Sequence, residues 1–138
     1  MNWYVKVLKQ YADFKGRARR KEYWMFFLIH LLILIGLSFL LVFISGGLVD
    51  NGEPSSLGLV IIGGYFLATI VPTLAVTIRR LHDTDKSGWW YLITLVPYIG
   101  SFIILIFTCM ESYHGTNKWG ENPKGVGNEK LINQIGKE

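Results

Sequence analysis

Charged residues are scarce in this chain. Of its 138 residues only 17% are charged, against about 25% in soluble domains, whereas 51% are hydrophobic. The single cysteine, Cys109, excludes an intramolecular disulfide and any zinc site built on cysteine pairs. The chain is also too short to hold a catalytic domain of about 200 residues beside a second unit. The composition therefore argues against a soluble protein and predicts one domain.

Three stretches contain no charged residue at all. They have 27, 25 and 24 residues and cover 23–49, 54–78 and 87–110. Each exceeds the roughly 20 residues that cross a bilayer core as a helix. The first is too long for the apolar core of a cleaved signal peptide, about 7 to 15 residues, so we expect it to remain as an anchor. We predict transmembrane helices over 23–45, 56–78 and 88–110, the third kinked or broken near Pro97 and Gly100.

Positive charge is distributed unevenly between these runs. Residues 1–22 carry seven Lys and Arg, 45–56 none, 79–86 three, and the tail from residue 111 four. Three spans with a cytoplasmic N-terminus put ten inside and four outside, in accord with the positive-inside rule. In an alternative, the third run forms a re-entrant hairpin and all 14 lie inside. We adopt three spans, because each hairpin arm would reach only about 17 Å and its broken backbone would need cover.

Aromatic and basic residues gather where the chain should meet the membrane surface. Over residues 2–14, aromatic and aliphatic side chains recur at helical spacing with lysines on the other face. This pattern predicts an amphipathic interfacial helix that lies on the cytoplasmic leaflet, packs against the span ends, or does both. The basic residues that follow are expected to bind anionic lipid headgroups, and we predict no nucleic-acid partner. The expected interfacial anchors are Trp3, Tyr23, Trp24, Trp89 and Trp90.

Two short segments combine arginines with carboxylates. One surrounds Arg17 and Arg20, and the other is the expected turn between the second and third runs, residues 79–86. In either topology both lie on the cytoplasmic side, where their arginines would repel one another unless carboxylates interleave. We therefore predict an electrostatic cluster of Arg17, Arg20, Glu22, Arg79, Arg80, His82 and Asp83, to which Asp85 could contribute. A phosphate-binding or proton-handling site is the chemical alternative.

Polar and small residues also occur inside the predicted spans. His30 should be neutral and hydrogen-bonded to a neighbouring helix, because a charged side chain at that depth is costly. Thr69 or Thr73 is expected to help satisfy the backbone carbonyl freed by Pro72. Small residues and Pro72 recur every fourth position and mark a face on which another helix can approach closely, namely Gly64, Ala68 and Pro72.

Four motifs occur in order along the chain. They are Phe14-x-Gly16-Arg17-x-x-Arg20-x-Glu22-Tyr23-Trp24, Arg79-Arg80-Leu81-His82-Asp83-Thr84 with Ser87-Gly88-Trp89-Trp90, Pro97-x-x-Gly100, and Gly115-x-Asn117-x-x-Gly120-x-Asn122-Pro123. Over about residues 2–125 the chain resembles the domain of unknown function 805 family, small proteins of the bacterial inner (plasma) membrane. Members often have glycine where this chain has Asp85. The resemblance implies a multi-pass membrane protein and supplies no activity and no catalytic residue.

The combined prediction is an all-α integral membrane protein. It has one membrane domain over 1–125, with an N-terminal interfacial helix and three spans, followed by a flexible polar tail over 126–138. We expect a non-enzymatic accessory or homo-oligomeric component without cofactor, metal or catalytic residues, whose partners are anionic lipids and other membrane proteins. A small transporter or channel subunit is the alternative, although the spans carry no Asp, Glu, Lys or Arg. A lipid-headgroup enzyme that uses His82 with Asp83 and with Arg79 or Arg80 is the third hypothesis.

Overall fold

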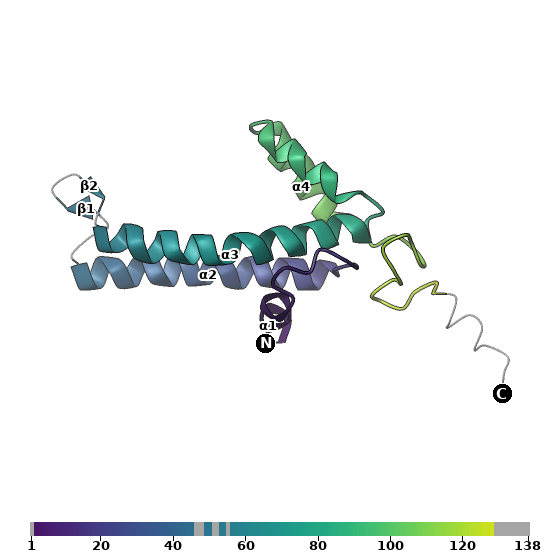
Figure 1. The fold of residues 1–138 in the computed structure, drawn as a ribbon, viewed down its shortest axis with the longest axis horizontal. Coiled ribbons are helices and arrows are strands. Elements are labelled where there is room, and N and C mark those ends of the chain that lie inside the picture. Colours follow the sequence, from purple (N-terminus) through teal and green to yellow (C-terminus); the bar gives the residue numbers. More distant parts are fainter. Residues whose placement is uncertain (1, 46–48, 51–52, 55, 129–138) are drawn as a thin grey trace.

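A pair of long helices forms the framework of the computed structural model, which describes residues 2–45, 49–50, 53–54 and 56–128. α2 (Arg20–Ser45) and α3 (Ser56–Asp83) run side by side (Figure 1). Both are long and apolar enough to cross a membrane. At 1.5 Å per residue each is about 40 Å long, whereas a hydrocarbon core is about 30 Å thick. Two of the expected span helices are therefore present, and each is a few residues longer than predicted.

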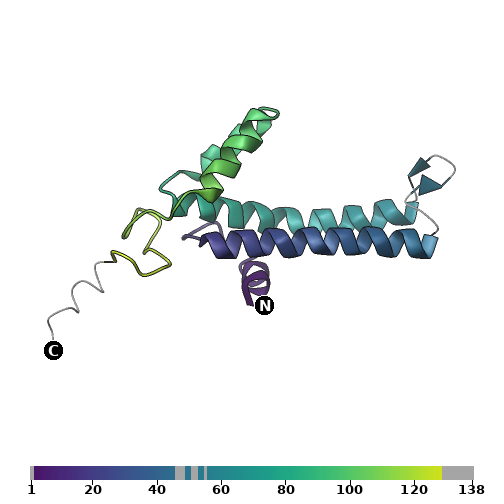
Figure 2. The same cartoon turned by 180° about the vertical axis from the view of Figure 1, so that it is seen from behind.

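A short β-hairpin follows α2 and precedes α3. β1 (Val49–Asp50) pairs antiparallel with β2 (Glu53–Pro54). The two strands lie at one end of the helix pair, and residues 110–128 lie at the other, as the views from both sides show (Figures 1 and 2). Apart from these four residues, the regular structure of the described chain is helical.

α1 (Asn2–Lys9) packs against the helix pair with its apolar face. Val7 is fully buried in a small core with Phe26 of α2 and Val76 of α3. The ring of Tyr4 stacks on Phe26 with centroids 5.2 Å apart. The helix is shorter than the predicted 2–14, and packing against the spans is the placement that the structure shows.

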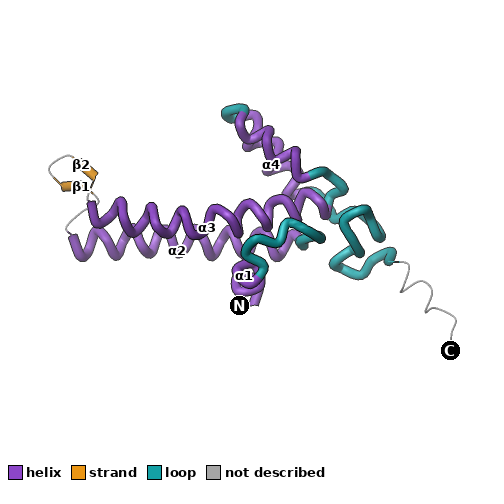
Figure 3. Tube along the Cα trace, viewed as in Figure 1, coloured by secondary structure: helices purple, strands orange, loops and turns teal. Residues whose placement is uncertain are grey.

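The third apolar run reverses direction. η1 (Gly88–Leu95) is a 3-10 helix whose N-cap, Ser87, accepts from the backbone N–H of Trp89, and α4 (Ile99–Cys109) follows it. Together they form a hairpin that projects obliquely from the end of α3 (Figures 1 and 3). At its tip Tyr98 has a φ of +63°, a conformation that no continuous helix contains. The expected break near Pro97 and Gly100 is present, and it divides the predicted span over 88–110 into two short arms.

Gly100 allows the two arms of this hairpin to approach each other. A Cβ atom at Gly100 would lie 1.8 Å from the carbonyl oxygen of Ile93, so a side chain would force the backbone apart. The rings of Trp90 and Phe107 meet edge to face across the arms, with centroids 5.5 Å apart. The Pro97-x-x-Gly100 motif therefore specifies a tightly packed reversal.

The chain after α4 returns to the end of α3 and packs there. The backbone N–H of Tyr113 donates to the carbonyl of Asp83 at 2.8 Å. Further along, Asn122 and Asn128 exchange hydrogen bonds of 2.7 and 3.1 Å. The packed tail thus extends to Asn128, three residues beyond the expected boundary, and residues 129–138 of the predicted flexible tail lie outside the described residues.

Pro72 leaves one carbonyl of α3 without its helical partner. Proline has no N–H, so the carbonyl oxygen of Ala68 loses its usual hydrogen bond. The hydroxyl of Tyr11 donates to this oxygen at 2.7 Å. Thr69 donates one turn back along its own helix, at 2.8 Å. The donor thus comes from the N-terminal segment instead of the expected Thr69 or Thr73.

This hydrogen bond predicts a specific coupling between Tyr11 and Pro72. We expect Tyr11→Phe to lower the free energy of unfolding by about 1 kcal/mol, because the Ala68 carbonyl loses its donor. In a Pro72→Ala background the helix regains its own N–H donor, so Tyr11→Phe should cost close to nothing. Unfolding of the four proteins in detergent completes the cycle. An equal cost in both backgrounds would show that the hydroxyl does not serve this carbonyl.

Candidate functional site

The predicted ionic residues of the second segment sit on the last two turns of α3. These residues are helical because α3 continues through the stretch where a turn was expected, and all of them are buried. They are Arg79, Arg80, His82 and Asp83. α3 is about 12 Å longer than a hydrocarbon core is thick, so its polar end can stand at the membrane surface. Only then does the backbone turn, at Asp85, which has a φ of +59°.

Asp83 is the centre of the buried ionic cluster. Its carboxylate accepts from Arg17 Nε at 3.0 Å, from Ser112 Oγ at 2.6 Å, and from the guanidinium of Arg80. The side chains of Arg17, Arg80 and Asp83 are 1%, 0% and 0% exposed. Removing two cations and one carboxylate from water is favourable only when their other polar atoms also find partners.

Backbone carbonyl oxygens supply those partners. Arg17 donates to the carbonyls of Tyr113 and Gly115, both at 2.7 Å. Arg80 donates to the carbonyl of Thr108 at 3.1 Å. The two arginines thereby fasten the tail and the end of α4 to α3.

The glycine-rich tail motif shapes the acceptor for Arg17. Gly115 has a φ of +81°, and a Cβ atom there would lie 3.0 Å from the carbonyl oxygen of Gly127. Gly120, with a φ of +130°, pairs with Asn117 through two backbone hydrogen bonds of 3.0 Å. Glycine is favoured at these positions because residues with a Cβ rarely adopt such angles, and the resulting turns direct carbonyl oxygens at one guanidinium.

A second ionic group joins the first three helices. Glu22, 1% exposed, accepts from Lys6 at 2.7 Å and from Arg79 at 3.5 Å. Arg79 also donates to the side-chain oxygen of Gln10. One guanidinium nitrogen of Arg79, Nη2, is buried without a hydrogen-bond partner among the described residues. Sequence reasoning did not assign Lys6 and Gln10 to the cluster, because both lie on the polar face of the predicted interfacial helix.

Arg20 stands apart from the buried cluster. Its side chain is 44% exposed and pairs with Glu111 at 3.4 Å. Glu111 also accepts from Lys124, and this hydrogen bond lowers the pKa of the Glu111 carboxyl below its usual value. Asp85, the other carboxylate considered for the cluster, is exposed and makes no ion pair with the described residues. The predicted cluster therefore divides into a buried part and an exposed pair.

His82 serves as a packing residue. Its ring stacks on Trp119 with centroids 4.5 Å apart and planes 10° apart. Its Nδ1 lies 3.3 Å from the carbonyl oxygen of Gly16. Because the carboxylate of Asp83 is taken by Arg17, Arg80 and Ser112, the His–Asp pair needed for the chemical alternative does not form.

The remaining predicted positions lie along the two long helices and the hairpin. Tyr23 and Trp24 meet edge to face with centroids 5.6 Å apart. Trp89 and Trp90 are exposed, and the side chain of Trp3 lies outside the described residues. Tyr65 lies within hydrogen-bond distance of His30, 2.9 Å from hydroxyl to Nδ1, as expected for a histidine paired with a neighbouring helix.

The small-residue face of α3 is only partly covered. Pro72 is buried, whereas Gly64 and Ala68 are exposed. No heavy atom lies within 4 Å of a Cβ built on Gly64, once the neighbouring backbone of its own helix is set aside. This part of α3 is therefore open to a neighbouring molecule or lipid.

Asp83 and Arg17 should be strongly coupled in folding. We expect Asp83→Asn to lower the free energy of unfolding by about 3 to 5 kcal/mol, because two arginines stay buried without their carboxylate. Arg17→Gln in the same chain should recover part of the loss. Arg20→Gln is the matched control, since its exposed pair is worth about 0 to 1 kcal/mol. Unfolding in detergent measures both cycles, and coupling within about 0.3 kcal/mol for Asp83 and Arg17 would contradict the cluster.

Comparison with known proteins places the chain among membrane proteins. A family model described as Protein of unknown function (DUF805) matches residues 11–121. Inner membrane protein YhaI of Escherichia coli strain K12 is 47% identical over 127 residues, which cover 90% of this chain and 97% of YhaI. Inner membrane protein YhaH of the same strain is 44% identical over 131 residues, 90% of this chain and 98% of YhaH. No solved structure matches. The chain therefore belongs to the DUF805 family.

Proposed function

We propose that the chain is a non-enzymatic component of the bacterial inner membrane, in which two spanning helices carry a cytoplasmic platform. The platform consists of residues 10–19, 77–87 and 110–128. The names of the E. coli relatives support the location. Large apolar side chains exposed along α2 and α3 suit contact with lipid, and Phe43, 91% exposed, is the most extreme on α2.

The pairing of the buried carboxylates of Asp83 and Glu22 with cations carries the non-enzymatic part of this proposal. Arg17 and Arg80 direct their donors at Asp83 and at backbone carbonyls, and Glu22 is held by Lys6 and Arg79. A catalytic group must be within reach of a substrate, whereas these side chains, apart from Lys6, are closed off by their partners. The platform therefore supports an accessory or homo-oligomeric role, with the open face around Gly64 available to a second copy or another membrane protein.

The distribution of charge between the two ends of the helix pair supports a cytoplasmic location for the N-terminal segment and for the tail. Arg17, the end of α3 and the tail up to Asn128 gather at one end of the helix pair (Figure 1). β1 and β2 lie at the opposite end (Figure 1), and the sequence from 45 to 56 contains no Lys or Arg. The positive-inside rule then favours the charged end as cytoplasmic. η1 and α4 are each about 16 Å long, half the thickness of a bilayer core, so the hairpin enters the membrane and returns.

Cysteine labelling tests this topology. We replace Cys109 with alanine and introduce Glu53→Cys or Thr116→Cys, one in each end region. In spheroplasts an impermeant maleimide should label the cysteine at 53, whereas the one at 116 should react only after lysis. Labelling at 116 in intact spheroplasts would put the tail outside and restore three spans.

Variants of His82 test whether its side chain has a packing role or a catalytic role. We expect His82→Gln to lower the free energy of unfolding by about 0.5 to 1.5 kcal/mol, because the stack on Trp119 is lost. Trp119→Leu should cost a similar amount, and the double variant should cost less than the two together. Phospholipid turnover by the wild-type chain should equal that of protein-free vesicles. Turnover that His82→Gln abolishes while stability is kept would instead show a lipid-headgroup enzyme.

A further inference from the structure

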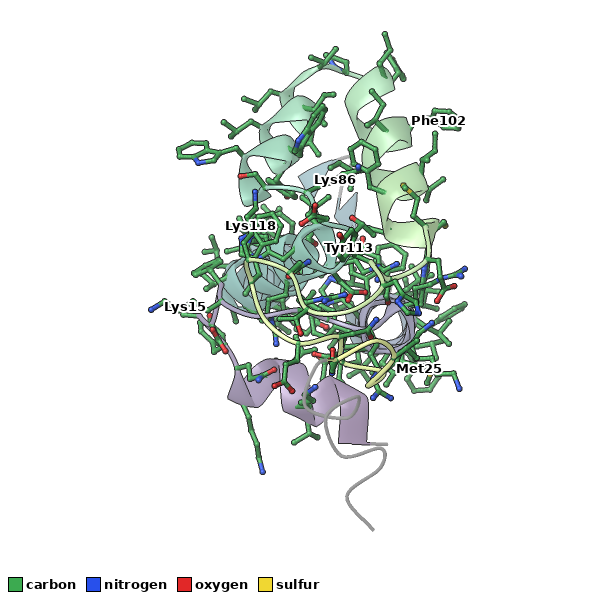
Figure 4. The ribbon with its side chains drawn as sticks, turned by 90° about the vertical axis from the view of Figure 1, so that its right-hand side faces the viewer. Lys15, Met25, Lys86, Phe102, Tyr113 and Lys118 are labelled. Atoms are coloured by element: carbon green, nitrogen blue, oxygen red, sulfur yellow. The ribbon has the colours of Figure 1, made fainter. Side chains whose placement is uncertain are left out.

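A cationic cavity lies outside the buried cluster, where α2 begins. It has a volume of about 660 Å³ and is lined by Arg19, Arg20, Lys21, Trp24, Met25 and Lys124. Figure 4 views the molecule from the end that carries the tail and shows Met25 beside the tail loops. The volume falls within the range of about 300 to 1,000 Å³ that is typical of small-molecule sites, so the cavity can hold more than a single inorganic ion.

The cavity has more positive charge than its surroundings neutralise. Glu111 pairs with Arg20 and Lys124. Arg19 and Lys21 make no ion pair with any of the described residues. The buried cluster differs in this respect, since its arginines are held by carboxylates. An anionic ligand would supply what Arg19 and Lys21 lack.

The lining also changes character along α2. Arg19, Arg20 and Lys21 come first, and Trp24 and Met25 follow one turn later, where the uncharged run begins. Trp24 is braced by Phe27, whose ring meets it edge to face with centroids 6.1 Å apart. A phospholipid has the same order, with a charged phosphate at the membrane surface and acyl chains beneath it. A free phosphate ion would use only the cationic part.

We propose that this cavity binds the headgroup of an anionic phospholipid. The phosphate lies against Arg19, Lys21 and Lys124, and the upper acyl chain lies along Trp24 and Met25. Because Lys124 belongs to the tail, the lipid joins the tail to the start of α2. The inference rests on the proposed placement of this end of α2 at the cytoplasmic surface of the membrane.

Lipid titration of the full chain tests the site. Delipidated protein in a neutral detergent is titrated with phosphatidylglycerol, and native mass spectrometry counts the bound lipids. We expect one tightly bound phosphatidylglycerol per chain and at least tenfold weaker binding of phosphatidylcholine, which lacks net negative charge. Inorganic phosphate should not displace the lipid at concentrations up to the millimolar range. Displacement by phosphate, or equal binding of the two lipids, would overturn the proposal.

Matched charge variants separate a site from general attraction. Arg19→Gln with Lys21→Gln should weaken phosphatidylglycerol binding at least tenfold, since each cation near an anionic lipid contributes measurably to binding. Lys9→Gln with Lys15→Gln also removes two exposed cations, outside the cavity, and should leave binding unchanged. Equal losses in both pairs would show non-specific attraction. Lys124→Gln leaves α2 intact and should also weaken binding, which keeps the test valid if the first pair folds poorly.

The proposed lipid site and the proposed topology can be contradicted independently of each other. A tail labelled from outside, together with retained phosphatidylglycerol selectivity in detergent, would overturn the proposed topology and keep the cavity as a lipid site. A cytoplasmic tail without lipid selectivity would keep the topology and overturn the lipid site.

Discussion

Burial of the Asp83 carboxylate constrains the arrangement of nearly every other segment. The single negative charge of Asp83 pairs with two cations, Arg17 and Arg80, so this group has a net charge of plus one. At a site with almost no exposure the excess must be met by dipoles, because an uncompensated buried charge costs several kcal/mol. Carbonyl oxygens at Thr108, Tyr113 and Gly115 supply these dipoles. The chain after α4 must therefore come back to the end of α3.

This requirement explains why the third apolar run is a hairpin. A continuous helix over its 24 uncharged residues would carry the tail about 36 Å away from α3, out of reach of Arg17. Two arms of about 16 Å bring it back. A chain reversal leaves backbone groups without helical partners, and here Gly100 N–H donates to the Val96 carbonyl at 3.0 Å while Pro97 has no N–H to satisfy.

The features that could be predicted from sequence are those with a local signal. Charge-free runs of membrane length located α2 and α3, and Pro97 with Gly100 located the break. A carboxylate beside Arg17 and Arg80 could be predicted because repulsion among cations demands nearby acids, whereas Arg79 pairs with Glu22 in a separate group. The tail motif, known from family resemblance, marked an ordered segment, although its role as the acceptor loop for Arg17 was not apparent.

The features that could not be predicted depend on contacts between distant parts of the chain. Proline and glycine indicate that a helix breaks but do not give the direction of the next segment, which here depends on Tyr98 and on the tail contacts. The partner of Ala68 is Tyr11, 57 residues away, and one partner of Glu22 is Lys6, on the predicted interfacial helix. No sequence motif marks either pairing, because tyrosine and lysine are common residues in such a segment. The two contacts form only because α1 packs across α2 and α3.

The same packing gives neighbouring basic residues different environments. Ala18 is fully buried, its N–H donates to the carbonyl of Arg79 at 3.0 Å, and its own carbonyl accepts from Arg80 at 3.4 Å. With Ala18 held on both sides, Arg17 points into the cluster, while Arg19 lines the cavity at the start of α2. Ala18 also belongs to the small core with Val7, Phe26 and Val76. The basic segment thus places one arginine in the buried cluster and another at the cavity, with a small buried residue between them.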